Sequence, residues 1–380
     1  MRTQSETRPM HIAIVANTAW YIANFRLGFM QSLRAAGYQV SAICPAGDGL
    51  QQIAAAGFNH VTFQLQGKSI NPLRELGSVL SLRSALKRAA PDVILSHTPK
   101  GNIYTSFARR GLGMRQIAGV SGLGSSFIRQ DWLTRLVMRL YKLTFGGMDR
   151  VLFENPTDKA IFLQHGLVDA ARAEGIPGLG VDLDHFTCEP FAPLAQEGAP
   201  VFLMIARLLG DKGVREYAAA ARSVRLRHPH ARFQLLGSLD ASNPTAITAA
   251  ELAAWTSDTT IDYLGYTADV RPFIAAAHCI VLPSYREGMS RTLLEAAAVG
   301  RALIASDVPG CREAIELGVN GLLCEARNAG SLSAALSKFC TLPEARMRQM
   351  GAASRTKAQA QFSEALVTAT YLRSLEQLRR

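Results

Sequence analysis

The sequence predicts an α/β fold with two doubly wound parallel sheets, and three observations carry this prediction. Short apolar segments alternate with amphipathic helical segments through most of the chain. This alternation breaks once, over residues 177–200, which contain four prolines and little periodicity, and then restarts. The chain has 380 residues, which suits two domains at roughly 100–200 residues each.

The apolar segments are short and rich in Val, Ile and Leu, which is typical of parallel strands that are covered on both faces. In the first half we expect strands at His11–Ala16, Gln39–Cys44, Val61–Leu65, Asp92–Ser96, Gln116–Val120 and Arg150–Glu154. In the second half we expect them at Val201–Ala206, Arg232–Gly237, Ile261–Gly265, Cys279–Pro283, Ala302–Ser306 and Gly321–Cys324.

Helical patterns between these strands complete right-handed βαβ units. They include Phe25–Ala36, Pro72–Ala89, Trp132–Phe145, Val214–His228 and Arg291–Gly300. The break in the pattern sets the expected domains: residues 1–185, a linker at 186–199, residues 200–360, and a terminal helix within 361–380.

Charge and composition narrow the partners. The net charge of +11 is uneven, with 20 Lys and Arg against 12 Asp and Glu in residues 1–185, and 21 against 18 in the remainder. A basic first half favours a phosphate or an anionic membrane. Nucleic acid is disfavoured because the sequence has no Cys/His finger spacing, aromatic RNA-binding signature or dense basic tail.

Cysteine usage and hydropathy predict a cytoplasmic protein. The six cysteines are scattered without a C-x-x-C pair and read as reduced thiols. Residues 1–10 are polar, so we expect no signal peptide, and there is no apolar stretch of about 18 residues. A peripheral position on the inner face of the membrane stays open as an alternative.

Polar side chains collect where strands of the second half end, and this is the edge at which open α/β sheets bind ligands. Arg207 and Lys212 follow the first strand of that half. Glu287 follows its fourth strand, and Glu295 lies about a turn and a half inside the next predicted helix. Two carboxylates at this spacing can accept hydrogen bonds from the hydroxyls of two different sugars.

The same edge offers groups for a diphosphate. Arg207 and Lys212 can compensate the negative charge that grows on a departing diphosphate. The backbone N–H groups of Gly288, Met289 and Ser290 precede a helix, where donors and dipole favour an anion. The pattern therefore predicts a nucleotide-sugar donor site.

With the segment Ser306–Gly310, these residues resemble family 4 of the retaining glycosyltransferases. The resemblance implies the GT-B fold, with two Rossmann-like domains and a donor in the interdomain cleft. It also implies roles: Glu287 contacts the donor sugar near the reacting centre and Glu295 holds the ribose. Arg207 and Lys212 hold the diphosphate.

Segments of the first half narrow the resemblance to bacterial enzymes that extend undecaprenyl-diphosphate-linked or capsular glycans, often with N-acetylhexosamines. These segments are Asn17–Trp20, Asn24–Arg26, Ser96–Asn102 and Gly122–Gly124. Many family members have a glycine-rich loop after the first strand, whereas residues 17–20 contain no glycine.

The first half also supplies candidate residues, each with a simpler alternative. The resemblance implies that His97 contacts the transferred sugar, although it could merely cap its strand. Lys100 either binds an acceptor phosphate or is a solvated lysine. Asn17 either contacts the donor or caps a helix that starts near Asn24. Gly122 and Gly124 are expected to shape a loop that faces the acceptor.

Two further motifs each allow two interpretations. Asp182 and Asp184 match a metal-binding D-x-D, but they lie in the expected linker, so we interpret them as structural and expect no essential metal and no cofactor. Residues 128–145 form a basic amphipathic pattern. It indicates either a helix that packs its apolar stripe on the sheet or one that lies in a membrane interface.

These observations predict a retaining, metal-independent hexosyltransferase. The expected donor is a UDP-sugar, with N-acetylhexosamine as the first choice, and the expected acceptor is an undecaprenyl-diphosphate-linked saccharide. The alternatives are a UDP-sugar epimerase with the same fold and a non-catalytic nucleotide-sugar-binding protein. A hydride-transferring enzyme is disfavoured because no G-x-G-x-x-G follows a strand.

Overall fold

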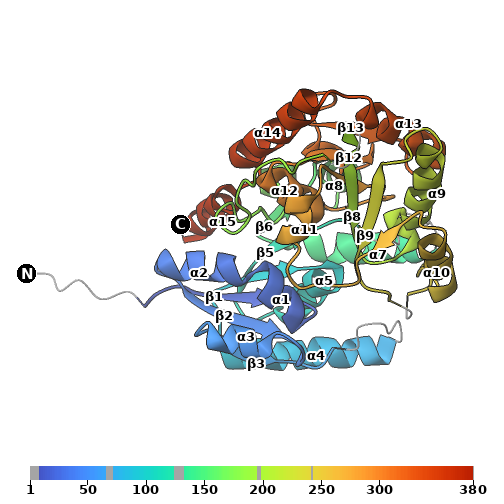
Figure 1. Ribbon diagram of the computed structural model, residues 1–380. Coiled ribbons are helices and arrows are strands. Elements are labelled where there is room, and N and C mark those ends of the chain that lie inside the picture. The colour runs from blue at the N-terminus through green and yellow to red at the C-terminus, as the bar shows by residue number, and fades with distance from the viewer. Residues whose placement is uncertain (1–7, 66–71, 124–131, 195–197, 241–242, 380) are drawn as a thin grey trace, which may run out of the picture. The chain divides into compact units, whose positions relative to one another are not determined.

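The computed structural model describes residues 8–65, 72–123, 132–194, 198–240 and 243–379. The chain folds into two compact units: unit 1 comprises Met1–Ile176 and Val367–Arg380, and unit 2 comprises Pro177–Leu366. Each unit is a parallel sheet with helices on both faces, which confirms the predicted fold class (Figure 1).

Unit 1 contains a seven-stranded sheet in the order β3-β2-β1-β4-β5-β6-β7. Its strands are β1 (His11–Val15), β2 (Gln39–Cys44), β3 (Asn59–Thr62), β4 (Val93–His97), β5 (Arg115–Val120), β6 (Arg150–Phe153) and β7 (Ala173–Gly175). Its helices are α1 (Ala19–Phe25), α2 (Leu27–Ala35), α3 (Leu50–Ala55), α4 (Pro72–Ala89), α5 (Pro99–Ala108), α7 (Trp132–Phe145), α8 (Pro156–Gln164) and the 3-10 turn η1 (Ala170–Arg172).

The sheet of unit 1 separates two apolar cores, because alternate side chains of a strand point to opposite faces. Ala13 and Val15 join one core with residues from α4, α5, α7 and α8. Ile12 and Ile14 join the other core with residues from α2, α3 and the last helix, α15 (Glu364–Arg379). The C-terminal helix thus completes the core of the unit that begins the chain.

Unit 2 contains a six-stranded sheet in the order β10-β9-β8-β11-β12-β13. Its strands are β8 (Val201–Ile205), β9 (Arg232–Leu236), β10 (Asp262–Tyr263), β11 (Cys279–Leu282), β12 (Ala302–Ser306) and β13 (Gly321–Cys324). Its helices are α9 (Val214–Arg225), α10 (Ala249–Ser257), α11 (Arg271–Ala276), α12 (Arg291–Val299), α13 (Ala329–Cys340) and α14 (Glu344–Gln361), with 3-10 turns η3 (Gly210–Lys212) and η4 (Arg312–Ala314).

The predicted helix Phe25–Ala36 is wrong at its start. The structure places two helices there, α1 and α2, which meet at Arg26, a residue with non-helical backbone angles (φ −129°, ψ −6°). The Arg26 side chain turns inward and is buried, so tertiary contacts override the helical pattern. The edge strand β7 was missed because its three residues, Ala-Glu-Gly, form no apolar run.

Candidate functional site

Each unit has a point at which strand order reverses, and ligands of doubly wound sheets bind beyond the carboxyl ends of the strands there. In unit 1 this switch point lies between the paired strands β1 and β4. In unit 2 it lies between the paired strands β8 and β11. Most of the predicted site residues end or follow these four strands, whereas Gly122 and Gly124 follow β5.

In unit 2, a glycine brings the loop after β8 against the end of β11. Gly213 has a left-handed φ of +77°, and a Cβ atom there would lie 2.1 Å from the carbonyl oxygen of Pro283. Only glycine fits this close backbone approach. The backbone N–H of Tyr285 donates to the Asp211 carbonyl at 2.9 Å, which ties the two loops together.

This approach joins Lys212 to Glu287, two residues that are 75 positions apart in the sequence. The Lys212 Nζ lies 2.5 Å from Glu287 Oε1, and the Ser284 hydroxyl donates to the same oxygen at 2.7 Å. The two side chains are 20% and 15% exposed, so the pair is largely shielded but reachable by a ligand. The Lys212 ammonium, which carries three donors, is thus placed at the switch point with one carboxylate partner.

The turn before α12 is held by the loop that follows β12. Gly310 adopts a φ of +82°, and a Cβ atom there would meet the backbone of Glu287 at 2.5 Å. The Ser290 N–H donates to the Gly310 carbonyl at 2.8 Å, and the Ser290 hydroxyl caps α12 by accepting from the Leu293 N–H. The Ser290 N–H, expected from sequence to face an anion, is therefore already engaged in this structure.

The remaining donor-site candidates have other partners. Glu295 is buried in α12, and Arg291, one turn earlier, donates to its carboxylate at 2.5 Å. Burial raises the pKa of Glu295, and Arg291 opposes that rise. Arg207 is 60% exposed and lies 4.0 Å from Asp240. The structure therefore joins Lys212 directly to Glu287, whereas Glu295 and Arg207 have other partners.

Gly288 and Met289 lie in the same turn. A Cβ atom at Gly178 would lie 2.6 Å from the Met289 side chain, so Met289 packs against the chain just after the start of unit 2. The contact is apolar and involves the side chain. This contact therefore fixes the position of the turn, and the Met289 side chain does not itself bind an anionic ligand group.

At the switch point of unit 1, His97 ends β4 and is buried, with only 1% of its surface exposed. An Arg26 guanidinium nitrogen lies 2.9 Å from His97 Nδ1, while Nε2 has no hydrogen-bond partner among the described residues. Burial, together with the charge of Arg26, lowers the pKa of His97 well below its ordinary value. The ring is therefore neutral near pH 7.

The residue after His97 is conformationally strained. Thr98 has a φ of +69°, which β-branched residues rarely adopt, and its hydroxyl accepts a hydrogen bond from the Gly101 N–H to cap α5. Strained backbone of this kind collects at functional sites because neighbouring contacts must hold it in place. This outlier lies directly beside the buried ring.

The other candidates of unit 1 have distinct surroundings. Lys100 forms an ion pair with Glu75 of α4 at 3.1 Å. The cap of α1 is Thr18, whose side chain accepts from the Tyr21 N–H, so the alternative that Asn17 caps a helix near Asn24 is wrong. Gly122 follows β5 with a left-handed φ of +105°, and Gly124 lies outside the described residues.

The D-x-D motif forms a local turn. Asp182 Oδ1 accepts hydrogen bonds from the backbone N–H groups of Asp184 and His185, both at 2.9 Å. An aspartate that caps its own turn in this way explains the motif without a ligand.

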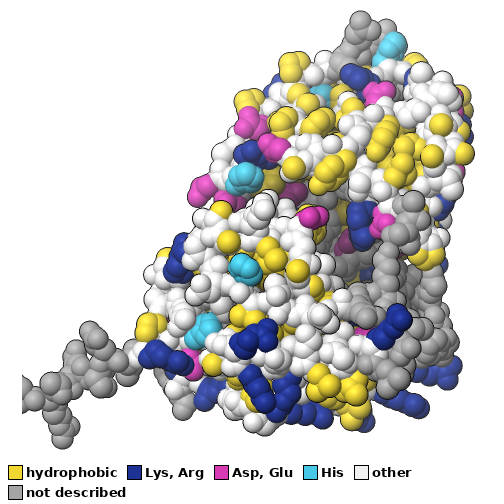
Figure 2. All heavy atoms as spheres, turned by 90° about the horizontal axis from the view of Figure 1, so that it is seen from below, with side chains coloured by type: hydrophobic (Ala, Val, Ile, Leu, Met, Phe, Trp, Pro, Cys, Tyr) yellow, Lys and Arg dark blue, Asp and Glu magenta, His cyan; other side chains and the backbone are white. Residues whose placement is uncertain are grey.

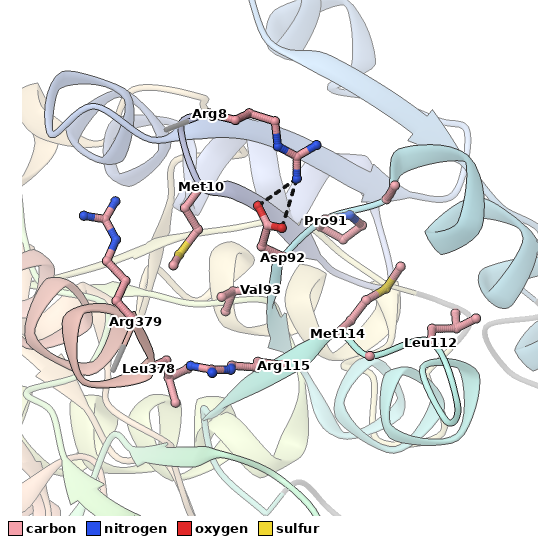
Figure 3. Close-up of a pocket in the computed structure, with 12 residues that line it drawn as sticks. Arg8, Met10, Pro91, Asp92, Val93, Leu112, Met114, Arg115, Leu378 and Arg379 are labelled. Carbon is pink, nitrogen blue, oxygen red and sulfur yellow. Dashed lines mark hydrogen bonds and ion pairs between the residues drawn. The ribbon is translucent and has the colours of Figure 1, made fainter. Parts of the chain in front are cut away.

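Figure 3 shows a cavity of about 560 Å³ in unit 1 that we do not assign to the site. Its lining includes Arg8, Asp92 and Arg115, and Arg8 is ion-paired to Asp92 at 3.0 Å. It lies where β1, β4 and β5 begin. Ligands of these sheets bind at the opposite ends of the strands.

Two family models match the chain, one in each half. Residues 22–178 match the Glycosyl transferase 4-like domain, and residues 199–341 match the family Glycosyl transferases group 1. Together the two matches define a glycosyltransferase with one domain of each kind. The chain belongs to glycosyltransferase family 4, with the GT-B fold.

Curated relatives include the N,N'-diacetylbacillosaminyl-diphospho-undecaprenol alpha-1,3-N-acetylgalactosaminyltransferase of Campylobacter jejuni. It is 28% identical over 96% of this chain and 98% of its own length. A UDP-Gal:alpha-D-GlcNAc-diphosphoundecaprenol alpha-1,3-galactosyltransferase of Escherichia coli is 25% identical over 71% of each chain. These relatives are transferases, so the epimerase alternative finds no support among them.

Among solved structures, HepE from Anabaena in complex with UDP and glucose is similar in fold. It has a TM-score of 0.78 and 16% identity, covering 97% of this chain and 99% of that one.

Two residues beside the site were missed at the level of sequence. Arg291 contacts Glu295, and a basic residue four positions before an acidic one on a helix could have signalled it. Arg26 contacts His97 across 71 positions, and no spacing rule joins two residues that far apart.

Proposed function

We propose that the protein is a retaining hexosyltransferase that moves an N-acetylhexosamine from a UDP donor onto an undecaprenyl-diphosphate-linked saccharide. The observation that carries the proposal is the Lys212–Glu287 pair at the switch point of unit 2. The Campylobacter relative, matched over 96% of this chain, bears an N-acetylgalactosaminyltransferase name with a diphospho-undecaprenol acceptor, which supports the sugar and acceptor classes. The UDP complex of HepE supports the nucleotide.

Each charged group of unit 2 binds a different part of the donor. Lys212 and Arg207 hold the diphosphate, and Glu295 accepts hydrogen bonds from the ribose. Glu287 contacts the sugar near the reacting carbon, where Lys212 and Ser284 hold its carboxylate in place. On donor binding, Lys212 shares its charge between Glu287 and the diphosphate. Ribose hydroxyls share the Glu295 carboxylate with Arg291.

Charge compensation is the main catalytic contribution of these residues. An acceptor hydroxyl attacks the anomeric carbon on the face from which the diphosphate departs, through a transition state that resembles an oxocarbenium ion. Lys212 and Arg207 stabilise the charge that grows on the diphosphate, so transfer needs no metal. The departing phosphate accepts the proton of the acceptor hydroxyl.

Unit 1 supplies contacts to both sugars. His97 donates a hydrogen bond to the transferred sugar. Lys100 exchanges Glu75 for a phosphate of the acceptor, since their ion pair is partly exposed. Asn17 lies at the end of β1 toward the donor, and Gly122 shapes the loop after β5 toward the acceptor.

We also propose that unit 1 touches an anionic membrane through α4 and α7, where the lipid-linked acceptor resides. Both helices bury one side in the same core and expose leucines on the other: Leu76, Leu80, Leu136 and Leu143. Arg74, Lys87, Arg88, Arg135, Arg139 and Lys142 are exposed on these helices. Leucines rimmed by cations suit an anionic lipid surface.

Figure 2 looks from the side on which Figure 1 places α4, and it shows Lys and Arg side chains near exposed hydrophobic ones. None of the helices in the described part of the chain is both long and apolar enough to cross a bilayer. Of residues 128–145, positions 128–131 lie outside the described residues. In the remainder both interpretations hold in this proposal, because Tyr141 and Phe145 are buried while Leu136 and Leu143 are exposed.

The transfer proposal is tested by mass spectrometry of products. The purified protein is incubated with UDP-N-acetylhexosamines and a synthetic polyprenyl-diphosphate-sugar, with and without EDTA. We expect an acceptor extended by one sugar, the same anomeric configuration as the donor, and no effect of EDTA. An interconverted donor sugar without acceptor would instead indicate an epimerase, and donor binding without any product would indicate a binding protein.

Membrane contact is tested separately by flotation with vesicles. Binding to vesicles that contain phosphatidylglycerol should fall for the Leu136→Gln, Leu143→Gln double variant. The control is Leu226→Gln, which changes a leucine of unit 2 that is 85% exposed. Equal flotation of both variants would reject the assigned surface and leave the transfer proposal standing.

A further inference from the structure

Arg26 is a buried cation enclosed by aromatic rings. Its Cζ atom lies 5.9 Å from the ring centroid of Tyr21, 5.8 Å from that of Phe29 and 6.0 Å from that of Tyr371. Only 1% of its surface is exposed. Burial opposes its charge, but Tyr21, Tyr371 and Glu154 outweigh burial and raise the pKa of Arg26. An arginine guanidinium is not deprotonated in proteins, so Arg26 carries its charge at every working pH.

The contact of this cation with His97 defines where the imidazole proton lies. A guanidinium carries only donors, so the His97 Nδ1 atom, 2.9 Å away, must be the acceptor. A neutral ring that accepts at Nδ1 carries its hydrogen on Nε2. A second proton on Nδ1 would place two donors against each other, in addition to two positive charges.

Packing leaves the ring little freedom to turn. A Cβ atom at Gly119 of β5 would lie 2.6 Å from His97 Nδ1 and 3.1 Å from the Tyr371 hydroxyl. The ring of Tyr371, which α15 brings to this place, lies 6.3 Å from that of His97. The imidazole is thus held between β5, the Arg26 guanidinium and the C-terminal helix.

Three buried polar atoms of this cluster have no hydrogen-bond partner among the described residues: His97 Nε2, the Tyr371 hydroxyl and Arg26 Nε. Leaving a buried polar group without a hydrogen bond is unfavourable, and native proteins keep few such groups. A substrate hydroxyl at the switch point would relieve this cost at Nε2.

We propose that Arg26 is a positioning residue that fixes His97 as a neutral Nε2–H donor. The Tyr371 ring lies beside the same imidazole and limits its movement. His97 then serves as a hydrogen-bond donor to the transferred sugar and never as a base at Nε2. This inference rests on the proposed function for the identity of the ligand. The tautomer and the charge of the His97 imidazole can be measured without any substrate.

The first test is the tautomer of His97 in the unmodified protein. Nitrogen-15 spectra of the histidine-labelled chain, with His97→Gln used to assign the signal, should show a hydrogen on Nε2 and no titration between pH 5.5 and 8. A hydrogen on Nδ1, or a protonation step within that range, would overturn the proposal. An inactive protein with the expected spectrum would count against the proposed function alone.

The second test removes the cation. In Arg26→Met, the hydrogen of His97 should no longer be confined to Nε2, and the pKa of His97 should rise. The variant should lower kcat about tenfold or more and add an acid limb to the pH profile of kcat. The matched control is Arg34→Met, since Arg34 also stacks on a ring of unit 1, that of Phe58 at 4.4 Å, but is remote from His97 in sequence and contact. Arg26→Lys should restore part of kcat.

An Arg26→Met protein with an unchanged His97 spectrum and an unchanged pH profile would overturn the proposal. If Arg26→Met fails to fold, the His97 spectra of the unmodified protein and of Tyr371→Phe test the proposal instead. Tyr371→Phe keeps the ring and should therefore keep the His97 tautomer.

Discussion

The two switch points of this protein use opposite electrostatic devices. In unit 2, Lys212 and Glu287 form a charged pair that remains partly exposed. In unit 1, a buried cation contacts a neutral ring, and the Nε2 atom of that ring has no hydrogen-bond partner within the described part of the chain. The difference teaches that one fold can offer mobile charge at one sheet and a fixed, uncharged donor at the other.

The largest effect is expected from breaking the exposed pair. Glu287→Gln keeps the shape but removes the charge that faces Lys212, and it should lower kcat about 10²–10³-fold because charge placement near the reacting centre is lost. Steady-state kinetics with the lipid-linked acceptor measures this. Asp262→Asn is the control, since its ion pair with Arg232 lies in the same unit at the start of β10. Equal losses in both variants would contradict the assignment.

The next effect tests the backbone approach that brings the pair together. Gly213→Ala should destabilise unit 2 and separate Lys212 from Glu287, because the new Cβ atom would meet the Pro283 carbonyl at 2.1 Å. We expect a loss of about 1–3 kcal/mol in unfolding free energy, as in other overpacked sites, and a weaker affinity for UDP. Urea unfolding and calorimetric UDP titration measure both. The control Gly265→Ala has the same φ of +77° but open space around it.

The fixed ring of unit 1 can be disturbed from the opposite side. Gly119→Ala should push His97 away from Arg26, since its Cβ atom would lie 2.6 Å from Nδ1. We expect kcat to fall about tenfold with a smaller change in KM for the donor. Gly175→Ala, in β7 of the same sheet, has nothing within 4 Å and serves as the control. A Gly119→Ala variant with a displaced His97 ring and a normal kcat would show that His97 takes no part in the reaction.

The smallest effect concerns Glu154, which lies beside the buried cation. Burial raises the pKa of Glu154 to about 8, although Arg26 opposes the rise. The folded protein therefore keeps a proton that the unfolded chain releases between about pH 4.5 and 8, and stability falls as pH rises through this window.

Glu154→Gln removes this pH dependence. Its melting temperature should match that of the unmodified protein near pH 4.5 and exceed it by about 4 °C or more at pH 8, at ~2–4 °C per kcal/mol. Differential scanning fluorimetry across pH measures the difference. Glu174→Gln, a partly exposed carboxylate near Arg373, is the control. A constant difference between the two proteins at all pH values would show that Glu154 is ionised throughout.

Much of the fold was predictable because the strands are apolar and bounded by helical patterns. The strands Gln39–Cys44, Ala302–Ser306 and Gly321–Cys324 were predicted with the bounds that the structure has. Helices such as Pro72–Ala89 were predicted to the residue as well. The site candidates were found for the same reason: polar residues that follow buried strands must gather at one edge of a parallel sheet. Their roles in transfer stay predictions.

The sequence by itself determined the two sheets and which polar residues lie at their carboxyl ends, since local hydrophobic periodicity encodes both. Only the tertiary structure decided which of these residues touch. Lys212 meets Glu287 across 75 positions, Arg26 meets His97 across 71, and Tyr371 reaches His97 because α15 completes the core of unit 1. Such contacts depend on how whole helices and strands pack against one another, and the sequence of a short segment does not determine that packing.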